Sequence, residues 1–206
     1  MRFSLEALHQ IARAAGVPDP SGIPLSALMA ATALEESGGD PMTLPGDNGK
    51  AHGLLQVHEK WWPEIAAKTK SVARWRGARG TDFGKAIAMV RLAKPILEDA
   101  ARQAVAAGRV LEKRGFASGP VEVLMLTDAA WRGPGVLAWA ESTATGYVAE
   151  LDKRSPPTPG RLPRVRRHLT QLGVVNTWAG LGAILAYLGL GGVLVFILWA
   201  IGEWDA

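Results

Sequence analysis

Two adjacent acids and a serine, Glu35, Glu36 and Ser37, end an alanine-rich segment directly before a Gly-Gly-Asp-Pro sequence. The C-terminal end of a helix is slightly unfavourable for a carboxylate, because the helix dipole is negative there. The residues upstream of Glu36 are mostly apolar, and a carboxyl group against a hydrophobic wall has a raised pKa and stays protonated near neutral pH. Such a group can act as a general acid. Glu35 points about 100° away on the same helix, so we expect it to be solvated.

A glycine-rich segment, GDNGKAHGLLQVHEKWWP, follows at residues 46–63. Glycines at this density let the backbone turn tightly and approach a ligand. The amide of Gln56 can both donate to and accept from sugar hydroxyls or an N-acetyl group. A structural hairpin without other function would use the same residues, so the segment alone predicts either a hairpin or a saccharide site.

In combination, ESGGDP and GDNGKAHGLLQV resemble the catalytic region of goose-type lysozymes and soluble lytic transglycosylases. The motifs of that family are a Glu-Ser pair and a Gly-Leu-Met-Gln-(Val/Ile) block. The later segments AAWRGPGVLAW and TGYVAEL are similar to its Ala-Tyr-Asn-x-Gly-x-Gly-x-Val segment and its Tyr-Val element. The resemblance covers about residues 24–152 and implies a mainly α, lysozyme-like α+β domain with a small β-hairpin.

The resemblance also implies roles for single residues. Glu36 matches the catalytic acid, and Asp47 falls where goose-type lysozymes have a carboxylate assigned to positioning water. The substrate-binding residues that we expect are Ser37, Gly53, Leu54, Leu55, Gln56, Trp131 and Tyr147. The expected substrate is the glycan strand of peptidoglycan, cut at the β-1,4 bond between N-acetylmuramic acid and N-acetylglucosamine. A water held by Asp47 would give a reducing end, whereas attack by the muramic acid's C6 hydroxyl would give a 1,6-anhydro sugar.

The chain departs from the family pattern at two places. His58 stands where those lysozymes usually have a second aspartate, and Ala130-Trp131 replaces the Tyr-Asn pair of lytic transglycosylases. These departures favour an alternative, a catalytically inactive, membrane-anchored protein with a structural or peptidoglycan-binding role. The intact Glu36-Ser37 pair favours the enzyme.

Other conspicuous side chains have simpler explanations. The rings of Trp61, Trp62 and Trp75 could stack on sugars, but tryptophans are more often core or rim residues. His52 and His58 do not have the spacing of a metal-binding pair. We therefore expect neither a metal nor a cofactor.

The segments that must position the site are predicted to be mostly helical. SLEALHQIARAAG begins with a serine cap, and PLSALMAATALEES begins at Pro24 and ends before Gly38-Gly39. GLLQV is the one short extended candidate, suited to a small hairpin. Residues 83–108 predict one long helix or two, since Pro95 lacks a backbone donor.

The positive charge of the chain lies in its C-terminal tail. Residues 1–152 carry 17 basic and 17 acidic residues, whereas residues 153–206 carry 6 basic and 2 acidic ones. A nucleic-acid-binding domain normally has a basic excess of its own. We therefore expect no nucleic-acid partner.

A stretch of 35 residues without Asp, Glu, Lys or Arg, from 168 to 202, is long enough to cross a bilayer. We predict a catalytic domain at 1–152, a basic proline-rich linker at 153–170, one transmembrane helix at 171–202 and a short tail at 203–206. Small residues on this helix, Ala179, Gly182, Ala186 and Gly189, fit either homo-oligomeric packing or a smooth lipid-facing stripe.

The basic residues precede the predicted anchor and the two acids follow it, which by the positive-inside rule places residues 1–168 on the cytoplasmic or interior side. The first residues do not resemble a secretory signal. An enzyme held on this side of its substrate suits a bacteriophage protein, in the host inner membrane before lysis or in a virion membrane.

Overall fold

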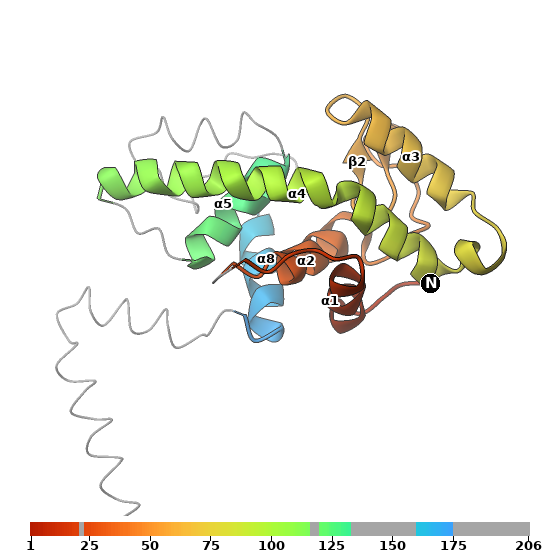
Figure 1. The fold of residues 1–206 in the computed structure, drawn as a ribbon, viewed down its shortest axis with the longest axis horizontal. Coiled ribbons are helices and arrows are strands. Elements are labelled where there is room, and N and C mark those ends of the chain that lie inside the picture. The colour runs from red at the N-terminus through yellow and green to blue at the C-terminus, as the bar shows by residue number, and fades with distance from the viewer. Residues whose placement is uncertain (21–22, 116–119, 133–159, 175–206) are drawn as a thin grey trace, which may run out of the picture.

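The computed structural model describes residues 1–20, 23–115, 120–132 and 160–174. This part of the chain is mainly helical with one small antiparallel sheet, as predicted (Figure 1). Its elements are α1 (Leu5–Ala14), α2 (Leu25–Ser37), β1 (Ala51–His52), β2 (Val57–His58), α3 (Pro63–Ala73), the 3-10 helix η1 (Gly77–Gly80), α4 (Asp82–Lys113), α5 (Pro120–Arg132) and α8 (Arg161–Gln171).

Helix α2 is the central element. Every residue from Leu25 to Ala33 is buried, so the helix has no solvent face over its first turns. A helix that is apolar all round belongs in a core, and α2 packs against α1, α4, α5 and α8. It ends as predicted, at Gly38, whose φ of 63° suits a residue without a Cβ. Leu34 and the two acids that follow it are thus the first residues of α2 that are only partly buried.

Helix α4 is continuous through Pro95 and has 32 residues, or a length of about 48 Å. Pro95 lies on its exposed side. Figure 1 shows the hairpin and α3 beside one half of α4 and α5 beside the other. Helix α4 is therefore the scaffold that links the two halves of the described domain.

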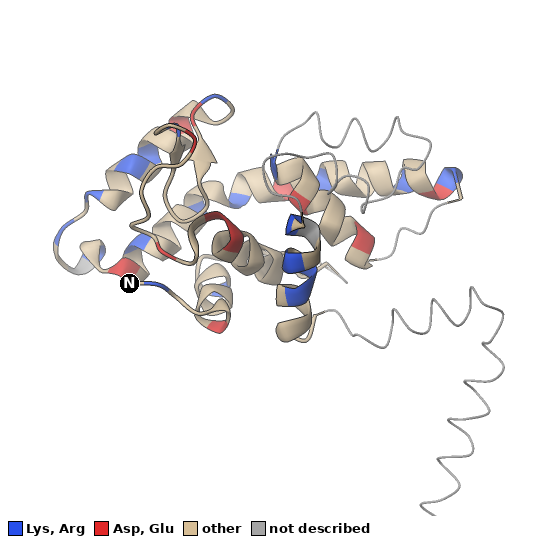
Figure 2. Cartoon of the chain, turned by 180° about the vertical axis from the view of Figure 1, so that it is seen from behind, with Lys and Arg blue, Asp and Glu red and all other residues tan. Residues whose placement is uncertain are grey.

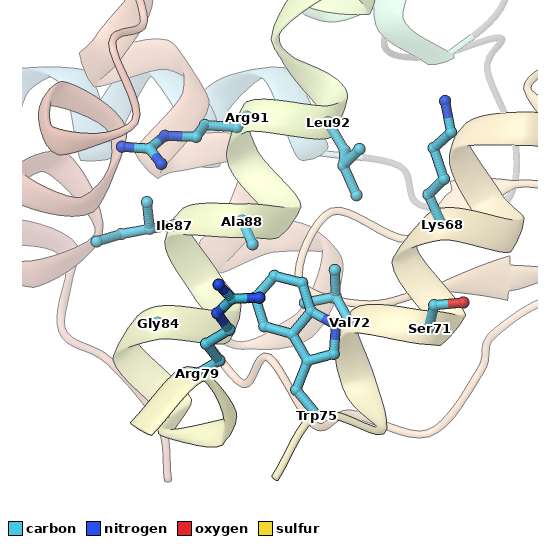
Figure 3. Close-up of a pocket in the computed structure, with 10 residues that line it drawn as sticks. All are labelled: Lys68, Ser71, Val72, Trp75, Arg79, Gly84, Ile87, Ala88, Arg91 and Leu92. Atoms are coloured by element: carbon cyan, nitrogen blue, oxygen red, sulfur yellow. The ribbon is translucent and has the colours of Figure 1, made fainter. Parts of the chain in front are cut away.

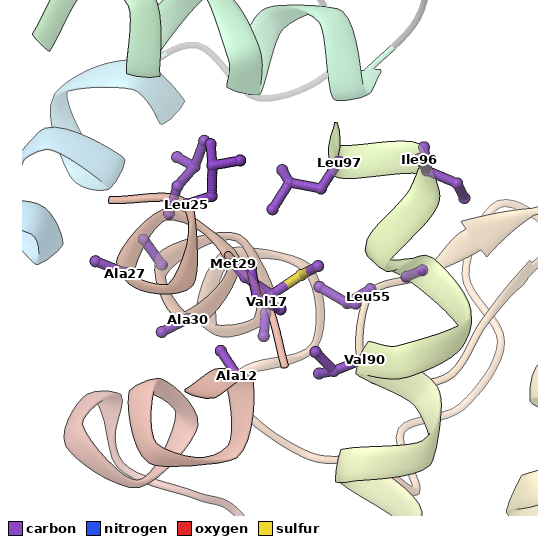
Figure 4. Close-up of a cluster of buried hydrophobic side chains, with 14 of the residues drawn as sticks. Ala12, Val17, Leu25, Ala27, Met29, Ala30, Leu55, Val90, Ile96 and Leu97 are labelled. Carbon is purple, nitrogen blue, oxygen red and sulfur yellow. The ribbon is translucent and has the colours of Figure 1, made fainter. Parts of the chain in front are cut away.

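The hairpin pairs Ala51 with His58 and His52 with Val57. Leu55, in the turn between the strands, lies in the core between α2 and α4 (Figure 4). The Leu54 backbone N–H lies 3.4 Å from the Met89 sulfur of α4. The hairpin is thus attached to the helical core by its own turn.

Residues 161–170, predicted to belong to an extended linker, instead form most of α8. Pro163 lies in the first turn of this helix, where no backbone donor is required. Val165 and Leu169, one turn apart, are both fully buried. The basic segment therefore folds onto the domain, and the prediction of a spacer over these residues is wrong.

No helix in the described part of the chain is long and apolar enough to cross a membrane. The predicted anchor at 171–202 lies outside the described residues except for residues 171–174, which include the end of α8.

Candidate functional site

Glu36 lies in the last turn of α2, and its side chain is 22% exposed. Nη1 of Arg161, the first residue of α8, donates to Glu36 Oε1 at 2.8 Å. The Ser37 hydroxyl donates to the Ala33 carbonyl of its own helix at 2.9 Å. The predicted acid is therefore mostly buried, and the Ser37 hydroxyl, which was expected to bind substrate, donates its hydrogen bond within its own helix.

Arg161 is held from its other side by Asp128 of α5. Its Nε and Nη2 atoms donate to the two oxygens of that carboxylate at 3.0 and 2.9 Å. The Asp128 side chain is fully buried and that of Arg161 is 5% exposed. A guanidinium thus joins two carboxyl groups that come from different helices.

Burial raises the pKa of the Glu36 carboxyl, because a charged carboxylate loses its hydration there. The positive charge of Arg161 acts in the opposite direction, and the negative charge of Asp128 adds to the effect of burial. The net result is a raised pKa, as a general acid requires. For Arg161, burial alone would lower the pKa, but the carboxylates of Asp128 and Glu36 outweigh it, so the guanidinium stays charged.

Glu35 is not solvated, contrary to expectation. Its side chain is 8% exposed, and its two oxygens contact Arg164 Nε at 2.8 Å and His168 Nε2 at 3.0 Å. Figure 2 shows the basic residues of α8 next to the acidic end of α2. The two glutamates point in different directions, as predicted, but both of them bind α8.

Asp47 lies in the loop before the hairpin, where it adopts a φ of 46°. Its side chain is 62% exposed, and Oδ2 lies 2.5 Å from His58 Nε2. The Nδ1 atom of His58 accepts from the Lys60 backbone N–H at 3.0 Å, which places the proton of a neutral ring on Nε2, facing Asp47. His58, one of the departures from the family pattern, is therefore the partner of the predicted water-positioning carboxylate.

The segment from Gly53 to Gln56 has mainly internal contacts. Leu54 and Leu55 are 0% and 1% exposed, so their side chains belong to the core and cannot touch a glycan. The Gln56 amide accepts from the Gly46 N–H at 2.7 Å and donates to the Gly53 carbonyl at 2.9 Å. The Gln56 side chain thus holds the loop together. A substrate could contact this segment only through its backbone atoms.

The remaining aromatic candidates differ in their placement. Trp131 is partly buried against the core at the end of α5. Tyr147 lies outside the described residues. Trp61, Trp62 and Trp75 are 48%, 38% and 36% exposed, so their rings are surface groups rather than core residues.

A groove of about 850 Å³ lies between α3 and α4 (Figure 3). Val72, Ile87 and Leu92 contribute apolar surface to it, and the cationic side chains at its wall are Lys68, Arg79 and Arg91. Its lining includes Trp75 but none of the predicted catalytic or substrate-binding residues, and no carboxyl group. The groove therefore lacks the carboxyl group that acid-catalysed glycoside cleavage requires.

Two histidine–carboxylate pairs lie on the hairpin, His58 with Asp47 and His52 with Glu59 at 2.8 Å, and Lys70 also contacts Glu59. Among the described residues, no three potential ligands come together to hold a metal ion.

Asp128 and the α8 residues Arg161, Arg164 and His168 were missed by sequence reasoning. One signal pointed to the first of them: Asp128 stands inside the apolar run VEVLMLTDAA, and a buried carboxylate requires a cationic or hydrogen-bonding partner. Comparisons of the chain with protein-family models, curated proteins and solved structures give no match.

Proposed function

We propose that this protein is a membrane-anchored, peptidoglycan-degrading glycosidase of lysozyme-like fold, with Glu36 as the general acid. The observation that supports this most directly is the placement of Glu36, a mostly buried carboxyl with a raised pKa at the end of the central helix. Within the described residues Arg161 binds its Oε1, and Oε2 makes no hydrogen bond. One oxygen is therefore held by Arg161, and Oε2 is the oxygen that we assign to the substrate.

In the proposed reaction, protonated Glu36 gives its proton to the oxygen between N-acetylmuramic acid and N-acetylglucosamine, and the bond from that oxygen to C1 breaks. The carboxylate that remains then accepts a proton from the group that attacks C1. If that group is water, the product has a reducing end, and the Asp47–His58 pair is the described candidate for holding the water. If it is the C6 hydroxyl of the same muramic acid, the product is a 1,6-anhydro sugar.

The apolar stretch at 171–202 is the proposed single-pass anchor, with the catalytic domain on the cytoplasmic or interior face of a host or virion membrane. The protein would then serve a bacteriophage in wall penetration or lysis. Its proposed partners are peptidoglycan strands and the bilayer, and a homo-oligomer of anchor helices is a further proposal.

One observation favours a second candidate, an inactive structural or peptidoglycan-binding protein anchored in the same way. The ion pair with Arg161 stabilises the charged form of Glu36, which cannot donate a proton. In the enzyme, burial must outweigh this pair.

Mass spectrometry of sugars released from purified peptidoglycan by the full chain in detergent separates these functions. Glu36→Gln should lower the rate of release by about 10²- to 10⁴-fold, the usual contribution of a general acid. Glu64→Gln, which changes an exposed acid on α3, is the matched control and should retain activity. Anhydro ends would identify a lytic transglycosylase and reducing ends a lysozyme. Release that survives Glu36→Gln, or no release at all, would contradict the proposal.

A further inference from the structure

We infer that Asp128 and Arg161 are positioning residues for Glu36: Asp128 fixes the guanidinium of Arg161, which in turn fixes one oxygen of the Glu36 carboxyl. This inference deepens the proposed function and rests on it for the role of Glu36. Its geometric basis is the chain of contacts from Asp128 through Arg161 to Glu36.

A guanidinium is a planar fork, so fixing two of its nitrogens fixes the direction of the third. Asp128 binds Nε and Nη2 along one edge, and Nη1 is then directed at Glu36 Oε1. Both members of the Asp128–Arg161 pair are almost completely buried, which leaves little room for another rotamer. Arg161 therefore holds the Glu36 carboxyl in one orientation.

Asp128 also balances the charge of Arg161. A lone guanidinium 2.8 Å from a carboxylate would stabilise its charged form strongly. With Asp128 bound to its other edge, the buried pair is formally neutral, and the loss of hydration decides the protonation of Glu36. The pair thus offers a hydrogen bond to Glu36 without the full effect of a positive charge.

The other charged and titratable groups around α2 have partners of their own or make smaller contributions at Glu36. On α5, Arg132 also pairs with Asp128, with its Nε 3.7 Å from Asp128 Oδ2, and its positive charge makes a smaller contribution that lowers the pKa of Glu36. Glu35 forms its own group with Arg164 and His168 of α8. On α1, His9 contacts Ser26 at the opposite end of α2.

Arg91 of α4 reaches the Ala14 carbonyl of α1 rather than the end of α2. Among the described residues, Arg161 is therefore the cation in contact with the Glu36 carboxyl, and Asp128 is the acid bound to that cation.

The test uses the full chain in detergent and two measurements, the ¹³C titration of the Glu36 carboxyl by NMR and the pH profile of sugar release. Asp128→Asn leaves the charge of Arg161 unbalanced, so the Glu36 titration and the high-pH limb of activity should both move to lower pH. Removing such a balance moves a carboxyl titration by about one unit or more, so activity above the limb should fall about tenfold. Asp99→Asn, which changes an exposed acid on α4, should move neither.

The double variant Asp128→Asn/Arg161→Met removes both charges. It provides the test if the single variant Asp128→Asn does not fold. It should move the limb less than Asp128→Asn does, because the positive charge of Arg161 is removed with the negative charge of Asp128 and only that of Arg132 is left unbalanced, while kcat falls because Oε1 has lost its donor. An unmoved Glu36 titration in folded Asp128→Asn, or an unchanged kcat in the double variant, would overturn the inference. If the unmodified protein releases no sugar, the proposed function fails, and the titration still tests whether Asp128 governs the charge on Glu36.

Discussion

Replacing Gly53 with alanine tests whether the hairpin turn is built for packing. Gly53 has a φ of 71°, and a Cβ there would lie 2.4 Å from Thr69 Cγ2 of α3 and 3.0 Å from Met89 Sδ of α4. The left-handed backbone costs a residue with a Cβ about 1–2 kcal/mol. Overpacking against two fixed helices costs about 1–3 kcal/mol more. Gly53→Ala should therefore destabilise the fold by roughly 2–5 kcal/mol in total.

Gly49→Ala is the matched control. Gly49 also has a positive φ, 87°, but a Cβ added there would meet no atom within 4 Å beyond its chain neighbours, so only the backbone cost applies. Thermal unfolding of the full chain, followed by circular dichroism, should shift down by roughly 2–4 °C per kcal/mol for a protein of this size. The difference between the two variants measures the packing contribution alone.

Thr69→Ser removes the methyl group that the new Cβ would meet and keeps the hydroxyl that donates to the Ile65 carbonyl. Gly53→Ala combined with Thr69→Ser should therefore recover part of the stability lost by Gly53→Ala. A Gly53→Ala variant no less stable than Gly49→Ala, or a double variant with purely additive effects, would refute the packing argument.

Three further changes have defined outcomes. Leu169→Ala should cost about 2–5 kcal/mol in urea unfolding, because its side chain is fully buried, and a cost near zero would show that α8 is not part of the core. Glu36→Gln should gain stability relative to the unmodified protein as pH rises above about 4.3, the unfolded pKa of a glutamate, in the same assay. The raised pKa of Glu36 contributes stability below that pH which is lost as pH rises through the folded pKa, and glutamine has no such loss. A stability difference that is constant with pH would contradict the raised pKa. Deleting residues 175–206, which leaves α8 intact, should release the protein from membranes washed with alkaline carbonate, and a deleted chain still in the pellet would contradict the proposed anchor.

The features predictable from sequence are those with local causes. Helix α2 begins after Pro24 and ends at Gly38 because a fixed φ at one end and a left-handed φ at the other are properties of those residues. The hairpin was likewise indicated by its glycines. Because of Pro95, the sequence predicted either one long helix or two. The structure has one continuous helix, in which Pro95 lies on the solvent side.

The partners of Glu36 could not be predicted in the same way, because their contacts are tertiary. Arg161 is 125 positions from Glu36, in a segment whose prolines and basic residues are typical of a linker. Its helix has few buried anchors, chiefly Val165 and Leu169 at a spacing of four. That spacing is a weak helical signal, and no local sequence pattern predicts which acidic residues the helix contacts.

Helix α8 changes where the functional unit ends. A chain stopped at residue 152, the predicted domain boundary, would keep Glu36 and Asp128 but lose the guanidinium that binds both. Removing one partner of a buried ion pair costs about 3–5 kcal/mol, and the core would also lose Val165 and Leu169.

Residues 1–174 should therefore unfold cooperatively, whereas residues 1–152 should be markedly less stable or insoluble. Urea unfolding of the two fragments checks this directly. Equal stability would mean that α8 rests on the domain without supporting it, and that the acids at the end of α2 do not depend on their cations. If the longer fragment alone is stable, the helix that leads to the proposed anchor is also the element that completes the site.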